Sequence, residues 1–159
     1  KFVEKMLSEV VYALNESNVI EHKGVQLSFQ IPFMRLTFRD TLLNYAHFDI
    51  ERHSELDNLR REACDRGING AMQMSRAAVL DELFKQFVRK NLQQPTFVTD
   101  YPVELSPLAK KRVSDPRYTE RFQLVIAGME VVNAFSELND PIDQKQRFEQ
   151  QQKNKEMKF

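Results

Sequence analysis

Three features are scarce in this sequence: cysteine, net charge and long apolar runs. Cys64 is the only cysteine, so an internal disulfide and a cysteine-rich zinc site are both excluded. Such low cysteine usage fits a reducing compartment, the cytoplasm. No run approaches the ~18 consecutive apolar residues of a membrane-spanning helix, and Lys1–Lys5 has no signal-peptide pattern. We therefore expect a cytoplasmic protein without a membrane anchor.

The charges of the chain cancel. Lysine and arginine together number 23, and so do aspartate and glutamate. A protein that grips a polyanion with its own surface is usually basic, so nucleic-acid binding by this segment alone is not expected. With 42% hydrophobic and 29% charged residues, the 159 residues have the composition of one ordinary globular domain.

Both ends of the chain suggest a cut through a longer protein. The sequence has no initiator methionine and opens directly in a helical pattern. It also stops inside a charged helical run at Lys158–Phe159. We therefore expect residues 1–159 to be part of a domain.

Hydrophobic periodicity predicts a mixture of helices and strands. Helices are predicted over residues 2–14, 37–45, 54–67 and 75–94, with a last one beginning at residues 140–141. Strands are predicted over residues 25–31, 96–101, 122–126 and 130–137, the last two forming an antiparallel hairpin. The expected fold is α+β, an antiparallel sheet with appended helices and a helical insertion at about residues 50–93.

Capping residues support these helix limits. Thr37, Ser54 and Ser75 are the expected N-terminal residues of three helices, because their hydroxyl groups accept from free backbone N–H groups. Gly67 is the expected C-terminal stop of the second of these helices.

The strand over residues 130–137 carries the most informative side chains. Period two places Asn133, Phe135 and Glu137 on one face: an amide, a ring and a carboxylate in a row. This set suits a lysine-like ligand, because the ring covers a methylene stem and the carboxylate pairs with an ammonium group. Glu130 has the opposite parity, so it joins this site only through a bulge or sharp twist before Asn133. The alternative is an ordinary strand with a solvent-exposed polar face.

Four ordered blocks resemble class II lysyl-tRNA synthetases, closely over about residues 95–150 and loosely before them. The blocks are Pro95–Thr96–Phe97 with Asp100–Tyr101–Pro102, Ser106–Pro107–Leu108–Ala109–Lys110, Thr119–Glu120–Arg121–Phe122, and Asn133–Ala134–Phe135–Ser136–Glu137–Leu138–Asn139–Asp140–Pro141. Four blocks in family order are far more specific than one short motif. The resemblance implies part of the catalytic domain of such an enzyme, a homodimer in which lysine reacts with ATP and is then transferred to tRNA(Lys).

The resemblance also implies roles for individual residues. Glu137 corresponds to the residue that binds the ε-ammonium group of lysine, Phe135 to the one that packs on its aliphatic chain, and Asn133 to the one that contacts its α-carboxylate. Glu130 corresponds to a ligand of the magnesium ion that bridges the phosphates of ATP. Magnesium prefers oxygen ligands and takes few protein carboxylates when phosphates supply the rest.

One position departs from the family pattern. Gln123 stands where the family carries a second glutamate that faces the metal and ATP. Glutamine offers a carbonyl oxygen but no negative charge, so we predict weaker binding of ATP with magnesium than a glutamate gives. The two earlier signature segments and the later glycine-rich segment with its catalytic arginine are not found in the chain. We therefore expect no catalytic residue within it and no lysine activation by these residues alone.

Two other functions stay open. A synthetase-like relative that lysylates a protein, or makes an adenylate for another purpose, is favoured only by Gln123. A non-catalytic interaction module that kept the fold is the third possibility, and it predicts no stabilisation by ATP or lysine.

Overall fold

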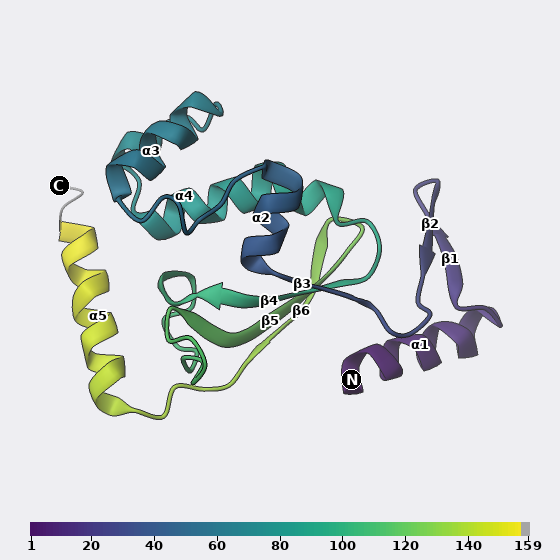
Figure 1. The fold of residues 1–159 in the computed structure, drawn as a ribbon. Helices are drawn as coiled ribbons and strands as arrows, with labels where there is room; N and C mark the ends of the chain where they lie inside the picture. Colours follow the sequence, from purple (N-terminus) through teal and green to yellow (C-terminus); the bar gives the residue numbers. More distant parts are fainter. Residues whose placement is uncertain (157–159) are drawn as a thin grey trace.

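A four-stranded sheet lies at the centre of the chain, with α2 and α4 beside it (Figure 1). Its strands are β3 (Met34–Thr37), β4 (Thr96–Pro102), β5 (Tyr118–Ile126) and β6 (Met129–Phe135), hydrogen-bonded in that order. The last three are antiparallel neighbours, whereas β3 runs parallel to β4. The computed structural model describes residues 1–156 and the side chains of residues 1–152. The helical run expected at Lys158–Phe159 lies outside these described residues.

A helical crossover joins the parallel strands β3 and β4, because parallel neighbours cannot be connected by a tight turn. It comprises α2 (Phe38–Ala46), α3 (Leu56–Asp65), α4 (Arg76–Leu83), a π-helical turn at Phe84–Val88, and 3₁₀ turns at Ala71–Gln73 and Arg89–Asn91. The predicted α+β class is confirmed, although the sheet is mixed rather than wholly antiparallel.

Apolar clusters cover both faces of the sheet. On the helical side, Val98 and Val125 pack with side chains of α2, α4 and the π-helical turn. On the other side, Phe97 and Leu124 pack with α1 (Phe2–Asn15) and with the hairpin of β1 (Val19–His22) and β2 (Val25–Ser28). Adjacent residues of one strand thus enter different clusters, as the alternation of a pleated strand requires.

Local capping signals are confirmed where their geometry is visible. Thr37 Oγ1 accepts from the backbone N–H of Asp40 at 3.0 Å, and the Asp40 carboxylate accepts from that of Thr37 at 3.2 Å. Ser75 Oγ accepts from the N–H of Ala78 at 3.3 Å and begins α4. Gly67 follows α3 with a φ of 85°, a left-handed conformation that glycine adopts without strain.

Several predicted elements need correction, and two strands were not predicted. The strands β1 and β3 were not expected, and the strand predicted over residues 25–31 ends at Ser28. The helix expected from Ser54 begins at Leu56, with Glu55 as its N-cap. The continuous helix predicted over residues 75–94 is divided among α4, the π-helical turn and a 3₁₀ turn. β6 ends at Phe135, two residues before Glu137.

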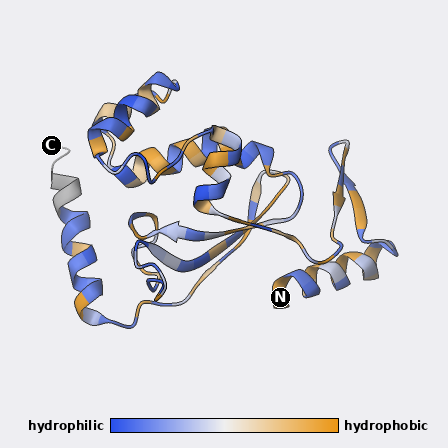
Figure 2. Cartoon of the chain, viewed as in Figure 1, coloured by the Kyte–Doolittle hydropathy of each residue, from blue (hydrophilic) through white to orange (hydrophobic). Residues whose placement is uncertain are grey.

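The last helix, α5 (Pro141–Glu156), is mainly hydrophilic (Figure 2). It is attached to the rest of the chain through a buried cation, Arg147. Arg147 is 8% exposed, and its guanidinium donates to the carbonyls of Ser106, Pro107 and Ala109 at 3.3, 3.3 and 2.7 Å. It also donates to both carboxylate oxygens of Asp143, at 3.0 and 2.8 Å. The segment 106–109 is therefore held by α5. No helix within residues 1–156 combines the length and apolarity needed to cross a bilayer.

Candidate functional site

A bulge in β6 decides which side chains share a face of the β5–β6 hairpin. Gln123 pairs with Asn133, whereas Val125, two residues further along β5, pairs with Glu130. Two residues lie between Glu130 and Asn133 but only one between Gln123 and Val125, so β6 has one residue more than β5 here, and Val131 is the extra one. The bulge places Glu130 on the face of Asn133. This is the condition for Glu130 to belong to a common site.

Gln123 and Glu130 lie together at a small cavity of about 150 Å³ between the sheet and the helices beside it. The side-chain NH₂ of Gln123, which is 8% exposed, donates to Glu130 Oε2 at 2.5 Å. Only an N–H group fits so close to a carboxylate oxygen, so the amide has one orientation. Its carbonyl oxygen accepts from the Tyr101 hydroxyl at 2.6 Å. Burial raises the pKa of the Tyr101 phenol above its ordinary value, so the hydroxyl keeps the proton it donates.

Arg121 connects this pair to Asn133. Its guanidinium lies 4.5 Å from the centre of the Tyr101 ring, and its Nε donates to Asn133 Oδ1 at 3.1 Å. A second nitrogen, Nη1, donates to the Leu105 carbonyl at 2.8 Å and to Ser106 Oγ at 2.9 Å. With its oxygen engaged by Arg121, Asn133 has its NH₂ group as the donor for a ligand carboxylate.

Phe135 and Glu137 continue the same row outside the cavity. Phe135 pairs with Arg121 and is 42% exposed. Glu137 follows the strand by two residues and is bridged to Ala109, so the alternation places it on the side of Phe135. Neither side chain lines the cavity that holds Gln123 and Glu130. The structure therefore unites the two residues of the expected ATP side, whereas the expected lysine-binding residues form an open row beside them.

Arg89 is a cavity residue that sequence reasoning missed. Its Nη2 lies 3.8 Å from Glu130 Oε2, and its Nε is buried without a hydrogen-bond partner among the described residues. Lys85 and Asp81, which form an ion pair at 2.5 Å, line the same cavity. The sequence gives no signal for Arg89, because its direction depends on the π-helical turn before it. Tyr101 belongs to one of the four sequence blocks that resemble the family, yet its contact with Gln123 depends on the register of β4 and β5.

The residues at positions 123 and 130 do not fit a magnesium ion held between them. Magnesium binds oxygen atoms, preferably carboxylate oxygens. Glu130 is the only carboxylate of the pair, and its Oε2 accepts from the Gln123 amide. The oxygen of that amide faces Tyr101 instead. Within the part of the chain that the structure describes, no group of three or more His, Cys, Asp and Glu could hold a metal ion.

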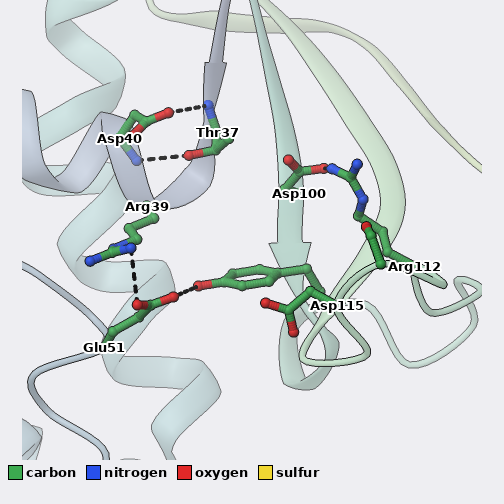
Figure 3. A pocket seen from close by; sticks show the side chains of 9 residues that line it. Thr37, Arg39, Asp40, Glu51, Asp100, Arg112 and Asp115 are labelled. Carbon is green, nitrogen blue, oxygen red and sulfur yellow. Dashed lines mark hydrogen bonds and ion pairs between the residues drawn. The ribbon is translucent and has the colours of Figure 1, made fainter.

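A larger pocket of about 350 Å³ opens beside α2, near the start of β5 (Figure 3). The Arg39 guanidinium lies 2.9 Å from the Glu51 carboxylate, which also accepts from the Tyr118 hydroxyl at 3.0 Å. Arg112 is paired with Asp100 across the same pocket. These charges satisfy one another within the protein, so the pocket is best explained as a structural cluster that attaches α2 to the sheet.

The mixed sheet, the helices between β3 and β4 and the row of polar side chains on one hairpin agree with the class II aminoacyl-tRNA synthetase domain that the four sequence blocks resemble. The family described as tRNA synthetases class II (D, K and N) matches residues 1–159, and the chain belongs to this family.

Curated relatives make the comparison more specific. The chain is similar to a lysine–tRNA ligase of Chloroflexus aurantiacus, with 44% identity over 149 residues, and to one of Dehalococcoides mccartyi, with 41% identity over 150 residues. In both, the match covers 94% of this chain and 30% of the relative. A lysine–tRNA ligase of Porphyromonas gingivalis is 39% identical over 153 residues, which is 96% of this chain and 26% of the relative. The chain thus spans about 30% of the length of the curated relatives it matches.

Proposed function

We propose that the chain is part of a lysine–tRNA ligase that activates lysine with ATP and transfers it to tRNA(Lys). The bulge at Val131 is the observation that carries this proposal. It places Glu130 on the face that holds Gln123 and Asn133, so that one side of the hairpin presents a site of mixed chemistry. The similarity to three named lysine–tRNA ligases supports the same activity.

The proposed roles of the residues follow their order along β6 and the segment after it. Asn133 donates to the α-carboxylate of lysine, Phe135 covers the aliphatic chain, and Glu137 pairs with the ε-ammonium group. Gln123 and Glu130 face the ATP side, where Glu130 alone would offer a carboxylate to a magnesium ion that arrives with the phosphates. Positioning and charge stabilisation are then the main contributions of this part of the site.

Further parts of the proposal concern the whole protein. We propose a homodimer in the cytoplasm, and we propose that residues 50–93 are a helical insertion into the catalytic domain. The helices α3 and α4 within that range pack against each other and against the 3₁₀ and π-helical turns that flank them, and both also join the apolar cluster that contains Val98 and Val125 of the sheet.

Lysine binding by the full-length parent protein tests the proposal. Glu137→Gln removes the charge that faces the ε-ammonium group and leaves the size of the side chain. We expect the affinity for lysine in calorimetry to fall by about tenfold or more, because a charge-assisted contact is worth ~1.5–3 kcal/mol. Glu120→Gln is the matched control, since Glu120 is exposed on the same hairpin with the opposite parity. Equal lysine affinity in both variants and the wild type would contradict the assignment.

Glutamine at position 123, where the family carries a glutamate, favours a second candidate, a synthetase-like protein that lysylates another protein. The two functions differ in the acceptor of the activated lysine. The parent protein, supplied with labelled lysine, ATP and tRNA(Lys), is expected to label the tRNA. Labelling of protein with no transfer to tRNA would select the alternative, and absence of stabilisation by both lysine and ATP would leave an interaction module.

A further inference from the structure

Arg89 places a positive charge beside Glu130, the residue to which the family resemblance assigns a metal ion. Its guanidinium Nη2 lies 3.8 Å from Glu130 Oε2, the oxygen that also accepts from Gln123. Its buried Nε has no hydrogen-bond partner within the described residues. A buried N–H group without a partner is costly, and a phosphate oxygen matches the donor geometry of a guanidinium well.

The local charge sums to zero both in the family pattern with its metal ion and in the set of residues found in this chain. Two glutamates and a divalent magnesium ion sum to zero. One glutamate, one glutamine and one arginine also sum to zero, and this is the set formed by Glu130, Gln123 and Arg89. Glutamate at position 123 would leave an excess negative charge beside Arg89 unless a metal also bound. Glutamine therefore suits a site in which the cation is part of the protein.

The backbone holds Arg89 firmly in this place. The end of its helical segment is tied to the β5–β6 turn, where Ala127 N–H donates to the Gln93 carbonyl at 2.8 Å and Gly128 N–H to the Leu92 carbonyl at 3.0 Å. Gly128 has a φ of 71°, and a Cβ there would lie 3.3 Å from the Arg89 carbonyl oxygen. The π-helical turn at Phe84–Val88 precedes Arg89, and such turns frequently occur at functional sites.

We propose that the guanidinium of Arg89, together with the amide of Gln123, replaces one magnesium ion of the site and binds the phosphates of ATP. This inference rests on the proposed function. It names Arg89 as a nucleotide-binding residue of this chain and states that no metal is chelated between positions 123 and 130.

Two measurements on the full-length parent protein test the replacement. The first is the calorimetric affinity for α,β-methylene-ATP at saturating magnesium, in the wild type, Arg89→Gln and Arg89→Lys. We expect Arg89→Gln to weaken binding by about tenfold or more and Arg89→Lys to recover part of the loss, because lysine keeps the charge without the fork of donors. Arg61→Gln is the matched control, since Arg61 is exposed on α3, away from the cavity.

The second measurement counts bound metal by electron paramagnetic resonance, with manganese as the probe and the same analogue present. The double variant Gln123→Glu with Arg89→Gln is expected to bind one manganese ion more than the wild type. Equal counts, or an unchanged analogue affinity in Arg89→Gln, would overturn the inference. If Arg89→Gln does not fold, the analogue affinity of Arg89→Lys decides: weaker binding than in the wild type supports the inference, and an unchanged affinity overturns it.

The outcomes separate this inference from the proposed function. A wild-type parent that binds lysine and the analogue, with an Arg89→Gln variant that binds both equally well, removes the role of Arg89 only. A wild-type parent that binds neither lysine nor the analogue removes the proposed function itself. A lower melting temperature in Arg89→Gln with unchanged analogue affinity identifies a purely structural ion pair with Glu130.

Discussion

Arg147→Met tests how α5 supports the expected lysine-binding residue Glu137. Arg147 holds the segment 106–109 through three carbonyls. That segment in turn pairs with the chain around Glu137: Lys110 N–H donates to the Ser136 carbonyl at 2.8 Å, and Leu138 N–H to the Leu108 carbonyl at 2.9 Å. Methionine keeps most of the length and removes every donor, so the substitution isolates the contribution of the guanidinium.

The cost follows from the burial of the pair. Removing one partner of a buried ion pair typically costs about 3–5 kcal/mol. Asp143 is 17% exposed and keeps Lys111 at 3.0 Å, so its charge is not left alone. We therefore expect a cost below that range, about 2–3 kcal/mol. Since α5 is otherwise hydrophilic, this energy limits local undocking of the helix and the segment 106–109 rather than global unfolding.

Hydrogen exchange in the full-length parent protein measures this opening. The amides of Lys110 and Leu138 are expected to exchange about 30- to 150-fold faster in Arg147→Met, since each 1.4 kcal/mol is a factor of ten. Lysine affinity should fall in the same variant, because Glu137 loses its paired neighbour. Lys145→Met is the control on the same helix, where Lys145 is 78% exposed. Unchanged exchange at both amides in Arg147→Met would refute the proposed support.

Three further substitutions address stability in urea. The Arg39 guanidinium lowers the pKa of Asp49 to about 2 from an ordinary value of 3.8. The ionised carboxylate therefore stabilises the fold above pH ~4, and this contribution is lost as the pH falls toward 2, so Asp49→Asn should lower the unfolding midpoint at pH 5 and have little effect near pH 2. Thr37→Ala removes the N-cap of α2 and should cost ~1 kcal/mol, seen as a lower midpoint with an unchanged slope. Tyr101→Phe leaves the buried Gln123 carbonyl without its donor and should cost ~1–2 kcal/mol; an unchanged midpoint would mean that water replaces the hydroxyl.

The features that the sequence predicts well are those set by neighbouring residues. Thr37 and Ser75 cap helices because a hydroxyl reaches an N–H group three residues away, whatever the rest of the fold does. Gly67 ends α3 for an equally local reason, the left-handed backbone that follows the helix. The hairpin turn after β5 was also predicted, since alternation stops at Ala127–Gly128.

The elements that the sequence did not predict depend on distant partners. β3 has four residues, two exposed and two half-buried, and it becomes a strand by pairing with β4 about sixty residues later. β1 is equally short and exists through its pairing with β2. The strand expected over residues 25–31 ends early because its partner β1 begins at Val19, which pairs with Ser28; the Phe29 N–H donates to the carbonyl of Asn18, just before β1. Short strands contain too few residues to show a period by themselves.

The candidate site also has one part that the sequence alone predicts and one part that depends on distant residues. Alternation along residues 130–137 suffices to group Asn133, Phe135 and Glu137, but Glu130 joins them only through the bulge, which is visible in the pairing with β5. Gln123 stands out in the sequence as the loss of a negative charge. Its meaning changes once the helical crossover brings Arg89 to within 3.8 Å of Glu130, because a cation of the protein then accompanies the missing carboxylate. Taken alone, glutamine at position 123 indicates a weakened metal site. Taken together with Arg89, it indicates that a guanidinium takes the place of a magnesium ion while the local charge stays the same.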